Sequence, residues 1–302
     1  MMRVSNSYIS SPLNYIGGKY KLLPQLLPLF PSKIKTFVDL FCGGCNVGIN
    51  IRASKIVFND NLVYLIDLYK EFQRKGITEV VNHIDKRIDE YKLSLTNEEG
   101  YKELRSYYNK ERNSLDLFVL IAYSFNHQIR FNNSHAFNNP FGRERSSFNP
   151  KMKNNLYSFL GEFNKKEIEF TCFNFDDFDF SLYTSDDYIY CDPPYLITSG
   201  TYNDGKRGFT GWGSLEEKKL LDILSKLDER GVKFGLSNVL THKEQTNTIL
   251  QQWIQENNFY VWHLNKNYSN SNYQSNKAKT SLTDEVFISN YKPQSSQFTL
   301  TF

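Results

Sequence analysis

The stretch "TFVDLFCGGCNVGINIRASKIVFND", residues 36–60, decides the fold class of this chain of 302 residues. Residues 36–41 are a short β-rich run. A glycine turn and a short helix follow, and a second apolar run ends in Asn59 and Asp60. A strand, a glycine turn, a helix and a strand in this order are typical of a βαβ unit, whose two strands lie in a parallel sheet.

The same alternation returns in the second half of the chain. We expect further strands near residues 168–175, 186–195, 232–239, 259–265 and 285–291, and helices near residues 61–74, 77–125, 214–230 and 244–257. The pattern predicts an α/β fold with a Rossmann-like, doubly wound, mostly parallel sheet and an inserted helical, loop-rich lobe. We assign residues 1–75 and 160–302 to the main domain, and residues 76–159 to the inserted domain.

One part of this lobe, residues 126–155, differs in character from the rest of the chain. It is rich in Asn, Arg, Ser and Phe and shows no periodicity of a helix or a strand. Long irregular segments inside a compact protein are usually functional or disordered. The segment is also the most basic of the chain, because it contains Arg130, Arg143, Arg145, Lys151 and Lys153.

The charge and hydropathy of the whole chain limit the kinds of partner and the location that we expect. There are 36 Lys and Arg against 33 Asp and Glu, a formal net charge of +3. This excess does not by itself indicate a nucleic-acid partner, but it permits one if the basic residues lie on one face. No run of about 18 uncharged apolar residues is present, so we expect no transmembrane helix and no membrane partner. The start of the chain lacks the apolar core of a signal peptide, and we expect a cytoplasmic protein.

Two of the four cysteines, Cys42 and Cys45, have the C-x-x-C spacing of a redox or metal pair. A zinc site needs two further ligands at matching spacing, and none is evident. We therefore expect no metal, and we interpret both cysteines as small apolar residues beside the glycines. A redox or zinc protein remains the alternative that this pair would support.

Several unusual residues stand where predicted strands end. In open α/β sheets, ligands bind at the carboxyl ends of the strands, near the point where the strand order reverses. Asp39 and the glycines that follow it end the first strand, and Asp60 ends the second. Glycines let the backbone approach a ligand closely, and an acid after the second strand commonly binds ribose hydroxyls. The two strand ends together indicate a cofactor that contains a nucleoside.

A stiff corner, Asp192-Pro193-Pro194-Tyr195, ends a later strand. Proline fixes φ and has no N–H group, so the Asp192 carboxylate and the Pro193 carbonyl are two rigidly aimed acceptors. Two acceptors suit an exocyclic amine with its two N–H donors, and the ring of Tyr195 suits a flat base. This corner therefore predicts a site for an aminated base.

With "NYIGGKYKLL" near the N-terminus, "DLFCGG" at residues 39–44 and "DPPY" at residues 192–195, the chain resembles a known family. The order of these motifs is similar to that of the alpha-class, Dam-like DNA adenine-N6 methyltransferases, over about residues 12–292. The resemblance implies S-adenosyl-L-methionine as the cofactor and double-stranded DNA with a short specific sequence as the partner. It also implies either a restriction-modification system, with a cognate endonuclease acting on the same site, or a solitary enzyme.

The resemblance assigns roles position by position. The catalytic residues would be Asp192, Pro193, Pro194 and Tyr195. The cofactor would be held by Tyr15, Gly17, Gly18, Lys19, Asp39, Phe41, Gly43, Asp60, Phe175 and Asp192. The target adenine would rotate out of the duplex and stack on Tyr195, and Asp192 and the Pro193 carbonyl would orient its amine. The anion of Asp192 is the useful form, so this mechanism does not require a raised pKa.

The resemblance also places a DNA-recognition stretch in the lobe. Arg130 takes the position of an arginine that reads guanine, for which arginine is the commonest partner. The DNA contacts would come from Asn14, Asn126, Arg130, Asn132, Asn138, Arg143, Lys277 and Lys279. Some positions depart from the family pattern: Cys45 replaces a frequent glycine, Asn174 replaces a frequent acid, and Asn14 replaces the lysine of enzymes that read GATC. The DNA word therefore does not follow from the sequence.

Two further expectations and several alternatives accompany this assignment. Residues 196–213 predict a loop over the target base, and "TYN" at residues 201–203 looks like a family segment. The same catalytic motif also serves cytosine N4, RNA adenine and protein glutamine, although a basic inserted lobe favours duplex DNA. A catalytically inactive DNA-binding module on the same fold is a different class, against which the intact Asp192 and Tyr195 argue.

Overall fold

An eight-stranded sheet forms the centre of the molecule in the computed structural model, which describes residues 8–198, 211–264 and 283–293. Its strand order is β3-β2-β1-β4-β5-β8-β7, and the short β6 pairs with β5. The strands are β1 (Thr36–Asp39), β2 (Lys55–Asn59), β3 (Glu167–Thr171), β4 (Tyr188–Cys191), β5 (Lys233–His242), β6 (Gln245–Thr246), β7 (Tyr260–Leu264) and β8 (Thr283–Ser289).

The predicted α/β class and the mostly parallel sheet are confirmed. The first five strands of the order, from β3 to β5, pair in parallel, and β8 and β7 add an antiparallel edge. The strand order reverses between β1 and β4, because the chain first builds outward to β3 and then returns to the other side of β1. A ligand is expected at the carboxyl ends of these two strands.

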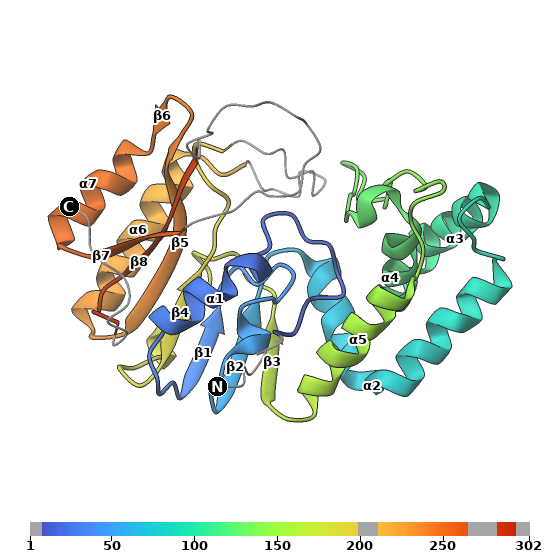
Figure 1. Cartoon of the computed structure of the whole chain (residues 1–302), viewed down its shortest axis with the longest axis horizontal. Helices are drawn as coiled ribbons and strands as arrows, with labels where there is room; N and C mark the ends of the chain where they lie inside the picture. Colours follow the sequence, from blue (N-terminus) through green and yellow to red (C-terminus); the bar gives the residue numbers. More distant parts are fainter. Residues whose placement is uncertain (1–7, 199–210, 265–282, 294–302) are drawn as a thin grey trace, which may run out of the picture.

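Alternating side chains of the strands divide the core into two layers. In β1 and β4, Phe37 and Tyr188 face one apolar cluster, whereas Val38 and Ile189 face the other. The first cluster is covered by α1 (Leu23–Leu26), the start of α2 (Val63–Glu90) and α5 (Pro150–Phe163). The second is covered by α6 (Ser214–Glu229) and α7 (Thr248–Asn257), which lie together on one side of the sheet in Figure 1.

The remaining helices build the lobe beside β3. It contains the second part of α2, α3 (Glu98–Glu111), α4 (Ser114–Tyr123) and α5, and Figure 1 shows it at the opposite end of the molecule from α7. Every residue of α4 is buried except Ser114, so α4 is the core of the lobe. Short 3-10 turns complete the structure: η1 (Tyr20–Leu22), η2 (Leu27–Leu29), η3 (Gly48–Asn50), η4 (Phe125–His127) and η5 (Phe180–Leu182).

Gly76 interrupts α2 near the boundary that the sequence predicts for the insertion. Its φ of 69° and ψ of 174° are not helical, so α2 consists of two helices joined at this residue. A positive φ is readily adopted by glycine and costs other residues free energy. The first helix packs on the sheet and the second belongs to the lobe.

Some predicted elements differ in extent from those observed. The helix predicted from residue 244 begins at Thr248, because residues 241–246 first form a hairpin in which the end of β5 pairs with β6. Asn247 then caps α7 by accepting a hydrogen bond from the Leu250 amide at 3.1 Å. The helix predicted after the glycine turn is only the single turn η3. None of the described helices is both long and apolar enough to cross a membrane.

Candidate active site

One pocket opens at the carboxyl ends of β1, β2 and β4, where the strand order reverses. All of the residues predicted to be catalytic or to hold the cofactor line it: Tyr15, Gly17, Gly18, Lys19, Asp39, Phe41, Gly43, Asp60, Phe175, Asp192, Pro193, Pro194 and Tyr195. They come from five separate parts of the sequence. The fold therefore brings the nucleoside-type features and the stiff corner into a single concave site.

The turn after β1 is held by two carboxylates. The Gly43 amide donates to Asp60 Oδ2 at 3.0 Å, and the Gly48 amide donates to Asp39 Oδ2 at 3.1 Å. Asp60 Oδ1 accepts a second backbone bond, from the Leu62 amide at 3.0 Å. Asp60 therefore fixes the shape of the turn, a task that its position at a strand end did not indicate.

Glycine is required at position 43 of this turn. Its φ is 44°, and a Cβ there would lie 2.8 Å from ring atoms of Tyr15. Cys45, two residues later, also has a positive φ, of 58°. A positive φ explains why glycine would be favoured at position 45, and the cysteine adopts the same conformation at some cost in free energy.

The cysteines of this turn are buried in the core. Cys42 is 6% exposed and Cys45 is fully buried. Burial raises the pKa of both thiols, which keeps them protonated, whereas redox exchange and zinc binding use the thiolate. Within the described residues, no group of three or more His, Cys, Asp and Glu side chains could hold a metal ion.

Asp39 is a buried carboxyl group that lines the pocket. Burial raises its pKa to about 8, and the nearby Asp192 and Asp60 add to the rise, whereas the Gly48 amide and Lys19 oppose it. A carboxyl group in this state favours the arrival of a cation, which would stabilise its anion.

The corner after β4 places Asp192 against Lys19. The Lys19 Nζ lies 2.7 Å from Asp192 Oδ1, and it also donates to the Gly17 carbonyl at 3.0 Å. The Lys19 side chain is only 2% exposed. Burial raises the pKa of Asp192, and Lys19 opposes this shift by its charge and its hydrogen bond. The expected mechanism does not need the raised pKa, but the site has one, because the Asp192 side chain is largely removed from water, with 17% of it exposed.

Tyr195 directs its hydroxyl towards two carboxylates, those of Asp192 and Glu285. Its Oη lies 3.1 Å from Asp192 Oδ1 and 3.2 Å from Glu285 Oε1, and the Lys19 Nζ lies 5.0 Å from the centre of its ring. Asp192 Oδ1 is thus shared between the lysine and the tyrosine. Its Oδ2 has no hydrogen-bond partner among the described residues.

Sequence reasoning did not single out Glu285, which lies on β8 and is 2% exposed. It lies in the segment "DEVFISNY", residues 284–291. A signal was present, because Glu285 is an acid followed by the apolar residues Val286, Phe287 and Ile288 of a strand. A buried charge in such a position requires a partner.

Phe41 and Phe175 line the pocket and pack against Trp212, a second residue that the sequence did not indicate. The rings of Phe41 and Phe175 lie 5.7 Å apart, and the ring of Trp212 lies 5.7 Å and 5.3 Å from them. The Trp212 indole donates to the buried Glu217 at 2.6 Å. Glu217 also accepts bonds from Asn238 and Asn247, at 3.0 and 2.8 Å.

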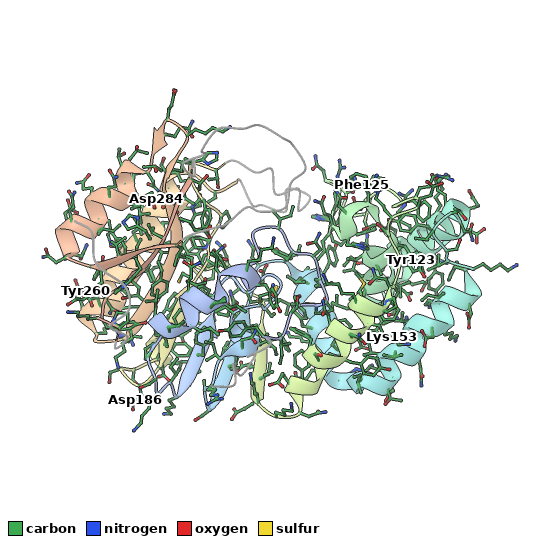
Figure 2. The ribbon with its side chains drawn as sticks, viewed as in Figure 1. Tyr123, Phe125, Lys153, Asp186, Tyr260 and Asp284 are labelled. Carbon is green, nitrogen blue, oxygen red and sulfur yellow. The ribbon has the colours of Figure 1, made fainter. Side chains whose placement is uncertain are left out.

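The predicted DNA-contacting residues that are described gather at one end of the lobe. Arg130 is exposed and forms no ion pair with another described residue, whereas the Arg143 guanidinium lies 2.7 Å from Glu98. Asn14 reaches this end from the N-terminal segment and donates to the Asn126 carbonyl at 3.0 Å. Phe125, labelled in Figure 2, marks this end, and Asp186, just before β4, lies far from it at the lower edge of the view. Lys277, Lys279, "TYN" at 201–203 and most of the predicted loop 196–213 lie outside the described residues.

The segment after α4, residues 124–149, is ordered by hydrogen bonds to its backbone, and we call it the recognition loop. Single bridges join Phe131 to Phe137 and Ser124 to Phe141. Asn139 is 2% exposed, and its amide donates to two carbonyls of the loop, at 3.0 and 2.9 Å. The irregular pattern of the sequence thus corresponds to a packed loop, and the predicted irregular stretch ends at Pro150, where α5 begins.

Two asparagines of the predicted DNA-binding set have different surroundings in this loop. The Asn132 side chain accepts bonds from the Ser134 and Ala136 amides, at 3.0 and 2.9 Å, so it holds the tip of the loop. Asn138 Oδ1 is buried and has no hydrogen-bond partner among the described residues. The side chain of Asn132 is therefore committed to the loop itself, whereas that of Asn138 retains an acceptor without a partner.

Comparison with known proteins gives a consistent result. The model of the D12 class N6 adenine-specific DNA methyltransferases matches residues 15–280. Type II methyltransferase M.FokI of Planomicrobium okeanokoites is 52% identical over 287 residues, which are 95% of this chain and 44% of that protein. Modification methylase StsI of Streptococcus sanguinis is 50% identical over 293 residues, 96% of this chain and 44% of that protein.

A third relative is matched by this chain over almost its full length. The DNA adenine methylase of Escherichia coli strain K12 is 28% identical over 295 residues, which are 93% of this chain and 95% of that protein. The chain thus spans less than half the length of M.FokI and StsI, and almost the full length of the Escherichia coli protein.

Proposed function

Because the chain belongs to the D12 class of N6 adenine-specific DNA methyltransferases, we propose that it transfers a methyl group from S-adenosylmethionine to the N6 amino group of adenine in duplex DNA. One observation carries this proposal: the glycine turn, the two strand-end acids and the Asp192–Tyr195 corner line a single pocket. A nucleoside cofactor and an aminated base can then meet there.

The pocket has the chemical features that S-adenosylmethionine requires. Its buried carboxyl groups, Asp39 and Asp192, suit a ligand that carries an ammonium and a sulfonium, because a cation would offset the cost of charging them. Asp60 stands at the end of β2, where an acid commonly accepts hydrogen bonds from ribose hydroxyls. Phe41 and Phe175 offer flat faces for the adenine. When bound, the cofactor would supply a methyl group on a positively charged sulfur.

The corner would orient the target amine. Asp192 Oδ2 and the Pro193 carbonyl would accept its two hydrogens, which turns the nitrogen lone pair away from the ring and towards the methyl group. The ring of Tyr195 would stack on the adenine, and for this its hydroxyl must be able to leave Asp192 Oδ1. Catalysis would then come from orientation and from the stabilisation of an amine that becomes positive.

The lobe would hold the duplex and read its sequence. We propose residues 76–159 as a DNA-recognition domain, in which the exposed Arg130 reads guanine and other basic residues contact phosphates. Phosphate contacts supply affinity without sequence information, whereas base-edge contacts supply the specificity. We propose a restriction endonuclease that acts on the same site as a partner in the cell, because two relatives are named as a type II methyltransferase and a modification methylase.

Methylation of defined DNA tests the proposal directly. The protein would be incubated with methyl-labelled S-adenosylmethionine and plasmid DNA, and the nucleosides identified by mass spectrometry. N6-methyladenine is the expected product. N4-methylcytosine, or label only in RNA or in protein glutamine, would overturn the substrate assignment, and binding of cofactor and DNA without transfer would indicate an inactive binding module.

A further inference from the structure

Glu285 is a buried carboxylate to which the proposed function assigns no task. It lies on β8, opposite Val239 of β5, and its side chain is 3% exposed. It does not line the pocket but stands directly behind the catalytic corner. Removing a carboxylate from water is costly unless it is paired, so its presence beside a second carboxylate calls for an explanation.

Two donors stand between the same pair of oxygen atoms. The Lys19 Nζ lies 2.7 Å from Asp192 Oδ1 and 3.6 Å from Glu285 Oε1. The Tyr195 Oη lies 3.1 Å from Asp192 Oδ1 and 3.2 Å from Glu285 Oε1. A phenol has one hydrogen, so Tyr195 donates to one of these oxygens at a time. Glu285 is thus an alternative acceptor for both donors.

The charges of this cluster do not cancel. Lys19 alone would neutralise Asp192, and a neutral pair would stabilise a developing cation poorly. The second carboxylate makes the net charge of the three groups −1. Tyr195 and Tyr190 also interact electrostatically with both Asp192 and Glu285, and Asp39 interacts with Asp192. Burial raises the pKa of all three, and both tyrosines stay neutral as a result.

We propose that Glu285 is a positioning residue: it takes over the hydrogen bond of Tyr195 and shares Lys19, so that Asp192 is freed for the target amine and the pocket stays negative where that amine becomes positive. This inference rests on the proposed function. It explains how the Tyr195 ring can change its contacts without leaving its hydroxyl unpaired. It also explains why a lysine as buried as Lys19 does not cancel the charge that catalysis needs.

Glu285→Gln tests the proposal, because it keeps the size of the side chain and removes its charge. Groups that stabilise developing charge directly contribute about 100-fold to 1000-fold to kcat, and for a group that acts through two others we expect a fall of about 10-fold to 100-fold. The matched control is Asp284→Asn, which removes the same charge one residue away, where Asp284 pairs with the partly exposed His263. The control should keep the wild-type kcat.

Two readouts separate positioning from a merely structural role. The charge of Glu285 raises the pKa of Asp192, so its removal should move the acid limb of the kcat profile to lower pH. In equilibrium binding, the preference for cationic S-adenosylmethionine over neutral S-adenosylhomocysteine should fall by about 3-fold or more. The reason is that the Glu285 carboxylate would attract the sulfonium charge over several ångströms in a buried site. An unchanged acid limb together with an unchanged preference would overturn the proposal, whatever happens to kcat.

A second variant covers the case in which Glu285→Gln does not fold, as judged by its thermal melt. Glu285→Asp keeps the charge but withdraws it by one methylene, so both readouts should shift in the same direction by less. Wild-type values of both in Glu285→Asp would then overturn the proposal. The wild-type protein is assayed in parallel: if it methylates no DNA, the proposed function itself fails, and the role of Glu285 is judged on cofactor binding alone.

Discussion

The candidate active-site pocket and the recognition loop differ in how their polar side chains are buried and paired. In the pocket, charged side chains are buried and paired with one another, as with Lys19, Asp192 and Glu285. In the recognition loop, Arg130 and Arg143 are exposed, and the order comes from asparagine side chains bound to backbone. The described residues contain two buried side-chain atoms without a partner, His127 Nδ1 and Asn138 Oδ1, and both lie in this loop.

The difference agrees with the two tasks that we propose. Methyl transfer needs charges that are fixed before the substrate arrives, because reorganisation during the reaction raises the barrier. Reading DNA needs donors and acceptors that remain available to the base edges and phosphates. Changes in the pocket should therefore alter the rate, and changes in the loop should alter the choice and the affinity of DNA. The following predictions test this division.

The largest effect is expected for Asp192→Ala. It removes the acceptor that orients the amine, and we expect kcat to fall by about 100-fold to 1000-fold. DNA affinity, measured by fluorescence anisotropy, should stay within a few-fold of wild type. Methyl transfer near the wild-type rate would contradict the assignment of the chemistry to this pocket, because the amine would then be oriented elsewhere.

Arg130→Ala should change the choice of DNA rather than the rate on the preferred site at saturation. Losing a bidentate contact to a base costs about 1–3 kcal/mol of discrimination, so the preference for the cognate word should fall by about 10-fold to 100-fold. Mapping of methylated adenines in DNA from an expressing host measures this. Arg143→Ala is the matched control, and it should weaken binding to all sequences alike. Identical methylation maps for wild type and Arg130→Ala would show that Arg130 does not read a base.

The binding of S-adenosylmethionine should depend on the pH through Asp39. Its pKa is raised to about 8 by burial, so below this pH the free protein holds a proton that a bound cation would expel. Affinity should therefore rise by about 10-fold between about pH 6 and pH 7.5. Calorimetry in two buffers of different ionisation enthalpy detects the released proton. In Asp39→Asn this release should vanish, and a release that persists there would assign it to another group.

The smallest effect on catalysis is expected for Asn139→Ala. Its amide satisfies the carbonyls of Phe125 and Gln128, and a buried group left without its bond costs about 1–3 kcal/mol. Thermal melts should show destabilisation of this order, and DNA affinity should fall, because the recognition loop loses its shape. The affinity for S-adenosylmethionine should stay at the wild-type value. A matching loss of cofactor binding would show that pocket and loop are one cooperative unit.

The sequence predicts the architecture well because the relevant signals are local. The glycine turn, the acids at strand ends and the stiff corner each lie within a few residues, and parallel strands bring their carboxyl ends to one edge. The roles of Glu285 and Glu217 could not be predicted in this way. They depend on how β8 and α6 pack against distant parts of the chain, and a single acid in an apolar stretch does not specify its partner.

The same limit applies to hydrogen bonds and pKa values. Asp60 binds backbone amides of the glycine turn, and Asn132 holds the tip of the recognition loop. Their residue types suited ligand contacts equally well. The raised pKa of Asp192 arises from burial, which is a property of the folded molecule and not of the motif.

Gly76 has a consequence for the geometry of the DNA word. A Cβ at this position would meet no atom within 4 Å, so the glycine is required by its backbone conformation and not by packing. The bend at this residue sets the direction in which the lobe leaves the sheet. Under the proposed function, this direction helps to set how many base pairs separate the base that is read from the base that is methylated. A D-alanine at position 76 should then preserve that interval, because it adopts a positive φ readily, whereas an L-alanine should change it.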